Sequence, residues 1–215
     1  MRMRKKPNLP KRLERCAGMI LEEPTAYCGK WLSTFGGSQL HLEIGAGKGK
    51  FLVETAKENP DIFFVGIERE EGALVVAAEK AIAAGLSNIR FLDVDAVNLP
   101  DFFATGELDR IYLNFSDPWP KKKQWKRRLT YRSFLSLYWD ALKADGAIFQ
   151  KTDNQKLFEF SLNEFSEVGY RLKNITFDLH ATDTPNIMTE YETRFTELGM
   201  PIYRTEAYKQ ETKRT

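Results

Sequence analysis

The sequence has few residues that could bind a metal or form disulfides. Its 215 residues include two cysteines, Cys16 and Cys28, and two histidines, His41 and His180. The histidines lie far from the cysteines, so no zinc-binding spacing emerges, and two cysteines do not make a disulfide framework. We therefore expect neither a metal centre nor a disulfide.

Long apolar runs are also missing. No stretch approaches the ~20 apolar residues that a membrane-spanning helix requires. The basic N-terminus is not followed by the apolar run of a signal peptide, and no repeat or low-complexity linker is visible. We expect a cytoplasmic protein that has no contact with a membrane.

The net charge of +2 conceals an uneven distribution. Residues 1–15 contain seven Lys or Arg and one acid, and residues 121–132 contain seven more and no acid, so the rest of the chain is acidic. Two basic segments on an acidic body predict contact with a polyanion. We expect residues 1–27, which three prolines interrupt, to form a basic arm, and residues 28–215 to form a single domain.

Strand-like and helix-like runs alternate from Gln39 onward. Short apolar runs typical of buried parallel strands occupy residues 40–44, 62–68, 89–92, 110–113 and 147–150. Helices are predicted at residues 50–58, 70–84, 132–144 and 155–167. Residues 193–209 contain two β-like runs around Gly199–Pro201, which predict a closing antiparallel hairpin.

This order of elements predicts a Rossmann-like, doubly wound α/β sheet that is mostly parallel and ends in the antiparallel hairpin. Such sheets bind their ligands at the carboxyl ends of the strands. The segment HLEIGAGKGKF, residues 41–51, follows the first predicted strand and so lies where a ligand is expected.

That segment carries glycines in an unusual spacing. A dinucleotide-binding fingerprint would place its third glycine at Lys50, and a Walker loop would place Ser or Thr after the lysine. Neither pattern is present. What remains is E-x-G-x-G-x-G, which consists of Glu43, Gly45, Gly47 and Gly49.

Acids lie at or near the ends of three successive strands. Glu43 would repel a pyrophosphate, but it favours the sulfonium and ammonium groups of S-adenosylmethionine. Glu68 can accept hydrogen bonds from ribose hydroxyls, although a dehydrogenase would offer the same acid, and Asp95 can accept from the adenine amino group. The three together favour S-adenosylmethionine over a dinucleotide. A turn that serves only packing is the structural alternative.

A second motif, NFSDPWPKKKQWKRRLT, follows the fourth predicted strand at residues 114–130. Asp117 lies on the same rim as the glycine turn, Trp119 and Trp125 offer faces on which a base can stack, and the lysines and arginines could follow phosphates. The simpler alternative is a solvated loop with Asp117 as a cap. Asp153, after the fifth strand, is explained equally well by a substrate contact and by a cap.

Together these motifs resemble those of the bacterial tRNA (guanine-N7-)-methyltransferases, which are class I S-adenosylmethionine-dependent enzymes. The resemblance extends from about Pro24 to the last strand. It is carried by LEIGAGKGKF, GIE, DA, NFSDPWPKKK, KRRL, QKTDN and TEYETRF. The glycine turn alone fits many methyltransferases, whereas its combination with DPWPK is specific.

The resemblance implies a class I methyltransferase fold and methylation of guanine N7 in tRNA, usually at position 46 of the variable loop. The predicted cofactor site consists of Glu43, Gly45, Gly47, Gly49, Glu68, Asp95 and Asp117, with Asp117 also the proposed catalytic acid. The substrate guanosine would contact Lys121, Asp153, Thr189, Glu190, Tyr191 and Glu192. RNA would contact Lys123, Gln124, Trp125, Lys126, Arg127 and Arg128. The family often has a histidine where Gln124 stands here.

The chemistry agrees with that expectation. Guanine N7 has an in-plane lone pair and no proton, so positioning rather than a general base should supply most of the rate. Asp117 would stabilise the positive charge that moves onto the guanine ring.

Three other functions compete with this one. An exocyclic-amine methyltransferase often carries a second proline where Trp119 stands here. A non-catalytic RNA-binding protein could keep an inert methyltransferase fold, and an NAD-dependent dehydrogenase is the most distant alternative. The sequence leaves a monomer and a homodimer equally open.

Overall fold

The computed structural model describes residues 8–210. Its strands form one seven-stranded sheet in the order β3-β2-β1-β4-β5-β7-β6. Strands β1 to β5 are paired in parallel, and β7 runs antiparallel to both β5 and β6. The strands are β1 (Gln39–Ile44), β2 (Ile62–Ile67), β3 (Ile89–Leu92), β4 (Leu108–Asn114), β5 (Leu142–Thr152), β6 (Arg171–Thr176) and β7 (Tyr203–Tyr208). The predicted fold class is confirmed.

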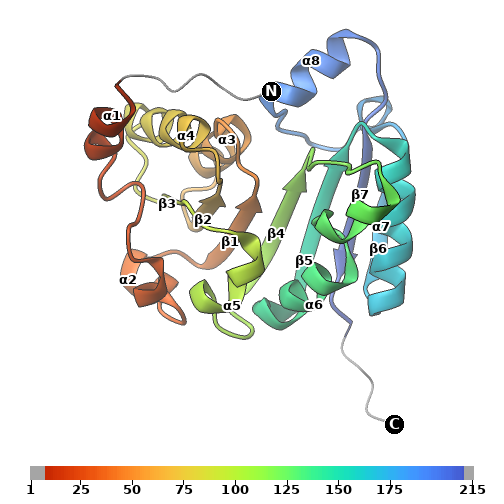
Figure 1. The fold of residues 1–215 in the computed structure, drawn as a ribbon, viewed down its shortest axis with the longest axis horizontal. Helices are drawn as coiled ribbons and strands as arrows, with labels where there is room; N and C mark the ends of the chain where they lie inside the picture. Colours follow the sequence, from red (N-terminus) through yellow and green to blue (C-terminus); the bar gives the residue numbers. More distant parts are fainter. Residues whose placement is uncertain (1–7, 211–215) are drawn as a thin grey trace.

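Helices cover both faces of this sheet. Figure 1 shows α1, α3 and α4 grouped together, and α8 beyond the carboxyl end of β4. The α-helices are α1 (Leu9–Arg15), α2 (Trp31–Phe35), α3 (Lys50–Glu58), α4 (Glu71–Ala83), α5 (Leu99–Phe102), α6 (Arg132–Ala141), α7 (Gln155–Val168) and α8 (Glu190–Glu197). Short 3-10 helices are η1 (Pro24–Tyr27), η2 (Ala96–Asn98), η3 (Lys122–Arg127) and η4 (Leu179–Ala181). None of the helices in residues 8–210 is long and apolar enough to cross a bilayer.

The central strands are apolar on both sides because both of their faces are covered. Along β2, Phe63 and Val65 belong to the core beneath α2, α5 and α6, whereas Phe64 belongs to the core beneath α3 and α4. Buried parallel strands therefore show continuous apolar runs rather than alternation. The same reason made these strands predictable from sequence.

The helix predicted at residues 132–144 is too long at its C-terminal end. Helix α6 ends at Ala141, and β5 begins at Leu142, which pairs with Leu108 of β4. A break in register follows before Arg110 pairs with Ala147. Pairing with a distant strand thus overrides the local helical pattern.

The predicted C-terminal hairpin is wrong in its first strand. The residues before Gly199 form α8 instead of a strand. This helix begins at a capping box: the Thr189 side chain accepts from the Glu192 N–H, and the Glu192 side chain accepts from the Thr189 N–H. The antiparallel neighbours of β7 are β5 and β6. Because β6 is exposed at most of its positions, no apolar pattern marked it.

The described part of the predicted arm packs against the body. The Arg12 guanidinium of α1 donates to both carboxylate oxygens of Glu79 on α4, at 2.7 and 2.6 Å. Cys16 and Met19 are buried, and the Met19 carbonyl accepts from the Phe91 backbone on β3 at 2.9 Å. The basic residues at positions 2, 4, 5 and 6 lie outside the described residues.

Candidate active site

The glycine turn joins β1 to α3 in a backbone conformation that favours glycine. Gly45, Gly47 and Gly49 have φ angles of 81°, 56° and 76°, in the left-handed region. A Cβ on Gly49 would also lie 2.6 Å from the Ala77 Cβ of α4. The glycines therefore let the turn bend sharply and let α3 and α4 approach each other.

Glu68, just after β2, holds this turn in place. Its carboxylate accepts from the backbone N–H of Gly47 and of Glu70, both at 2.8 Å. Carboxylate oxygens have several lone pairs, so Glu68 can still accept from hydroxyl groups of a ligand.

Glu43 of β1 is the most unusual charged residue of the site. Its side chain is buried, with 2% of the residue exposed, and Oε1 accepts from Asn114 Nδ2 at 2.8 Å. Oε2 is buried without a hydrogen-bond partner among residues 8–210. Burial, the largest cause, raises the pKa of Glu43 to about 7. A buried carboxylate with an unused oxygen is costly unless a cation meets it, so the site fits the cationic part of S-adenosylmethionine.

A cavity of about 800 Å³ brings together the other predicted acids. Glu68 and Asp95 line it from the ends of β2 and β3, and Asp117 and Trp119 line it from the loop after β4. Asp95 also accepts from the Val97 N–H at 3.2 Å and pairs with Arg69 at 2.7 Å. These three acids, far apart in the sequence, therefore share one cavity.

A smaller cavity of about 140 Å³ joins the glycine turn to the start of α8. Three residues predicted to contact guanosine line it beside Glu43, namely Thr189, Glu190 and Tyr191. Burial raises the pKa of the Tyr191 hydroxyl, and the charges of Asp153 and Asp117 raise it further, so these two acids lie near it. Lys121 and Asp153 line neither of these two cavities.

Glu192, predicted to contact guanosine, is instead fully buried among protein groups. Its exposed fraction is 0%, and its carboxylate accepts from Lys151 Nζ at 2.7 Å and from Asn186 Nδ2 at 2.6 Å. The Thr189 N–H donates to it at 3.3 Å, and His180 Nε2 lies 3.2 Å away. In this arrangement Glu192 anchors the start of α8 beside the glycine turn.

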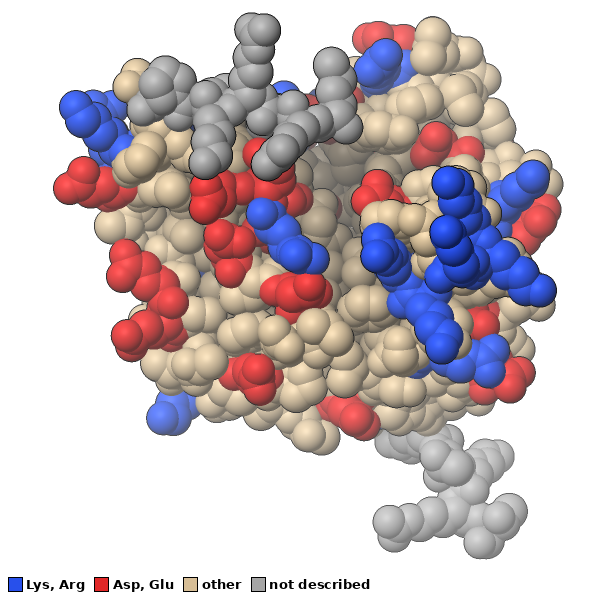
Figure 2. All heavy atoms as spheres, viewed as in Figure 1, with Lys and Arg blue, Asp and Glu red and all other residues tan. Residues whose placement is uncertain are grey.

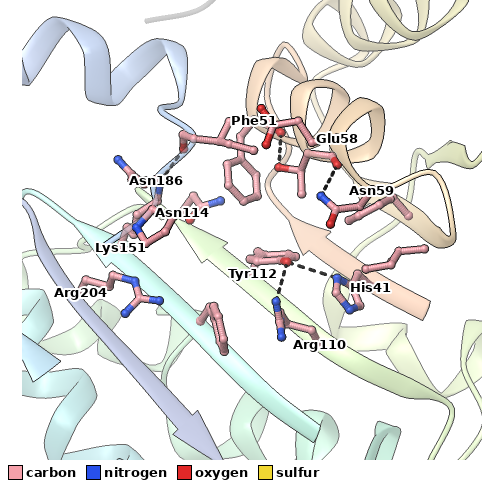
Figure 3. A pocket seen from close by; sticks show the side chains of 16 residues that line it. His41, Phe51, Glu58, Asn59, Arg110, Tyr112, Asn114, Lys151, Asn186 and Arg204 are labelled. Carbon is pink, nitrogen blue, oxygen red and sulfur yellow. Dashed lines mark hydrogen bonds between the residues drawn. The ribbon is translucent and has the colours of Figure 1, made fainter. Parts of the chain in front are cut away.

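Lys151 belongs to a third cavity, of about 400 Å³, which Figure 3 shows between α3 and the sheet. Its Nζ donates to Asn186 Oδ1 and to the Ile187 carbonyl, both at 2.9 Å. Asn114 lines this cavity and the two already described. No role was predicted for Lys151 from the sequence, although it lies in the QKTDN motif and directly follows the strand predicted at residues 147–150. A lysine buried at that place needs an acidic partner.

The predicted RNA-binding residues differ in their exposure. Lys123, Lys126 and Arg127 are exposed, and Gln124 and Trp125 are partly buried. Figure 2 shows Lys and Arg side chains gathered over the β4–α6 connection, with Asp and Glu side chains across a hollow from them. Arg128 is buried, so its side chain offers RNA little surface. In the described part of the chain, no group of His, Cys, Asp or Glu is placed to hold a metal ion.

Comparison with known proteins agrees with this geometry. A family model described as a putative methyltransferase matches residues 37–205. A tRNA (guanine-N(7)-)-methyltransferase of Geobacillus kaustophilus is 49% identical over 211 residues, which cover 97% of each chain. The enzyme of the same name from Halalkalibacterium halodurans is 48% identical over 96% of this chain and 95% of its own.

Solved structures agree at the level of the fold. An antibiotic-related methyltransferase has a TM-score of 0.61 at 19% identity, covering 84% of this chain and 92% of its own. The 16S rRNA methyltransferase KamB also has a TM-score of 0.61, at 14% identity, covering 81% of this chain and 89% of its own. With the near full-length relatives at almost half identity, and with the acids of the motif gathered at the strand ends, the chain belongs to the tRNA (guanine-N7-)-methyltransferase family, whose members are S-adenosylmethionine-dependent enzymes.

Proposed function

We propose that this protein transfers the methyl group of S-adenosylmethionine to N7 of a guanine in tRNA, at position 46 of the variable loop. The observation that carries the proposal is the shared cavity at the strand ends. Glu68 and Asp95 line one part of it, and Asp117 and Trp119 line another. A nucleoside cofactor and a purine base can therefore lie side by side in it.

The cofactor would be held by the acids and the glycine turn. Glu43 offers its unused Oε2 to a cationic group, Glu68 can accept from ribose hydroxyls, and Asp95 can accept from the adenine amino group. The N-terminus of α3, into which the turn leads, suits the cofactor carboxylate. When bound, S-adenosylmethionine supplies a methyl group activated by its sulfonium sulfur.

Asp117 would hold and stabilise the guanine. In methyl transfer the lone pair of N7 would form the new N–CH₃ bond as the S–CH₃ bond breaks, with the electron pair of that bond left on the donor sulfur. No proton is removed, so no base is needed, and orientation of the two reactants can supply ~7–11 kcal/mol. The carboxylate of Asp117 stabilises the positive charge that arises on the purine.

The exposed basic residues would bind the tRNA backbone. Lys121, Lys122 and Lys123 precede Lys126 and Arg127 on the same loop, and all five are exposed. Trp119, which lines the cavity, could stack on a base beside the target. We propose that it acts on tRNA in the cytoplasm.

Methyl transfer to tRNA transcripts tests this function. Transcripts with guanine at position 46 should accept one methyl group, and transcripts with adenine there should accept none. Digestion and nucleoside mass spectrometry should then identify 7-methylguanosine. Methylation of an exocyclic amine would support the alternative enzyme class, and tRNA binding without any transfer would support the inert RNA-binding protein.

A further inference from the structure

Arg128 differs from the basic residues that precede it in the loop. Only 4% of Arg128 is exposed, whereas Lys126 and Arg127 are exposed to solvent. Its guanidinium lies over the Phe160 ring, 4.4 Å from the centroid, and over the Trp125 ring, 5.0 Å from the centroid. Planar stacking of this kind suits arginine and cannot be reproduced by lysine. The side chain is therefore held inside the protein and not presented to a ligand.

The hydrogen bonds of Arg128 are made to the backbone beside Asp117. Its Nε donates to the Pro118 carbonyl at 2.8 Å, and its Nη2 donates to the Trp119 carbonyl at 3.3 Å. Both accepting residues directly follow Asp117 in the sequence. One guanidinium thus holds the two peptide groups that come directly after the Asp117–Pro118 peptide bond, so it restrains the loop that carries Asp117.

The backbone at this place needs such support. Trp119 has a φ of 40° and Phe115 a φ of 52°, which are unfavourable for residues with a side chain. Strained conformations of this kind persist only where surrounding contacts hold them, and they occur often at functional sites. Without Arg128, the Trp119 backbone would be free to relax toward an ordinary φ angle, and Asp117, two residues before it, would move with it.

Thr130, close to Arg128 in the chain, is itself buried and hydrogen-bonded. Two residues after Arg128, the Thr130 hydroxyl accepts from Ser161 Oγ at 2.8 Å. Ser161 Oγ accepts in turn from Gln150 Nε2 of β5 at 2.9 Å. Arg128 is therefore anchored to α7 and to the central sheet, which makes it a rigid point from which to hold a loop.

We infer that Arg128 is a positioning residue that aims Asp117 into the cavity, and not a contact to the RNA. The role of Asp117 toward the substrate rests on the proposed function. The contacts by which Arg128 holds the backbone of Pro118 and Trp119, which we call the clamp, do not depend on it. Two readouts separate these: kcat for methyl transfer, and hydrogen exchange of the backbone at residues 115–121, which needs no activity.

The informative variants are Arg128→Lys and Phe160→Leu, with Lys123→Gln as the matched control in the same basic segment. Arg128→Lys keeps the charge but loses the flat stack and one of the two carbonyl contacts. A displacement of about 1 Å can cost ~100-fold in rate, so kcat should fall about 10- to 100-fold. The tRNA dissociation constant and its salt dependence should stay within twofold of the wild type, because no phosphate contact is removed.

Phe160→Leu tests the same clamp from outside the basic segment. It removes one face of the stack, carries no charge change and lies on α7. We expect a smaller fall in kcat, several-fold, and faster exchange at residues 115–121. Lys123→Gln should affect binding rather than kcat. We expect weaker tRNA binding, a flatter salt dependence and a higher KM.

Two results would overturn the inference. One is a wild-type kcat and wild-type exchange in both Arg128→Lys and Phe160→Leu. The other comes from a further variant, Arg128→Gln, which removes the charge: a salt dependence of tRNA binding that flattens as much as in Lys123→Gln while kcat stays at the wild-type value. If the wild type transfers no methyl group but Arg128→Lys exchanges faster at residues 115–121, the proposed function fails and the clamp stands. Calorimetric melting and cofactor titration of each variant identify any that fails to fold, in which case Phe160→Leu carries the test.

Discussion

Asp117 is exposed in the cavity wall, and its proposed role is electrostatic. Asp117→Ala removes the charge that would stabilise the methylated purine, and losses of ~10²–10³ in kcat are typical for groups of this kind. We expect a fall of that size in kcat, while the affinity for S-adenosylmethionine changes by less than tenfold. Single-turnover kinetics and calorimetric titration measure the two. Asp117→Asn keeps the shape and should lose nearly as much rate; equal losses of rate and cofactor affinity would make Asp117 a cofactor ligand instead.

Glu43 should make both stability and cofactor binding depend on pH. Its pKa in the folded protein is raised from 4.5 to about 7. The folded state therefore holds a proton that the unfolded state has lost between these pH values, and folding stability falls as pH rises from 4.5 to 7. A shift of this size corresponds to roughly 3 kcal/mol at most.

The comparison of the wild type with Glu43→Gln isolates this effect. In protein without cofactor, the free energy of unfolding of the wild type should decline relative to that of Glu43→Gln between pH 4.5 and 7, and the difference should level off above pH 7.5. The cofactor cation favours the carboxylate, so its affinity in the wild type should rise with pH through 7. A constant difference in stability between the two proteins over this range would show that Glu43 has an ordinary pKa.

The helices and strands that were predicted correctly are those whose sequence pattern depends on neighbouring residues. Glu43 lies near the end of β1, and the glycine turn, Glu68 and Asp95 follow β1, β2 and β3. These strands are apolar on both faces, so both the strands and their ends could be predicted from neighbouring residues. Helix α8 and strand β6 depend on distant partners instead. Thr193 and Phe195 favour a strand locally, but the Thr189–Glu192 capping box and the buried contact to Lys151 make the segment helical.

Dependence on distant partners also limited the prediction of the site. DPWPK placed Asp117 correctly on the rim, but nothing near Arg128 in the sequence distinguishes it from Lys126 and Arg127. Besides the nearby Trp125 ring, its partners are the Phe160 ring, 32 residues later, and two carbonyl groups. Burial of a charge by distant aromatic rings is invisible to a charge pattern.

Helix α8 offers a test of how it is held. Lys151→Met leaves the fully buried Glu192 carboxylate without its cation, and breaking a buried pair in this way costs ~3–5 kcal/mol. Lys80→Met breaks the exposed pair of Lys80 with Glu190 on the same helix, which should cost less than about 1 kcal/mol. Urea unfolding measures both. Similar losses in the two variants would mean that the buried pair does not anchor the helix.

At the scale of the whole molecule, a nearly neutral chain presents a basic surface beside an acidic crevice (Figure 2). Acids suit a cationic donor, and the lysines beyond them suit phosphates. The two preferences do not conflict because they act on different ligands. A tRNA that approaches the lysines would be repelled by the acids unless its backbone stayed on the basic side, so this division also orients the RNA.

The salt dependence of tRNA binding tests this division. Lys123→Gln combined with Lys126→Gln removes two exposed charges from the β4–α6 connection. Each phosphate contact contributes ~0.7–0.9 to the slope of log K against log salt, so the slope should flatten by about 1.5. Lys30→Gln combined with Lys57→Gln removes two other exposed lysines, one at the N-cap of α2 and one on α3, and should leave the slope unchanged. If the first pair also leaves the slope unchanged, Lys123 and Lys126 make no phosphate contact, and the same measurement on variants of the other basic segment, residues 1–15, follows.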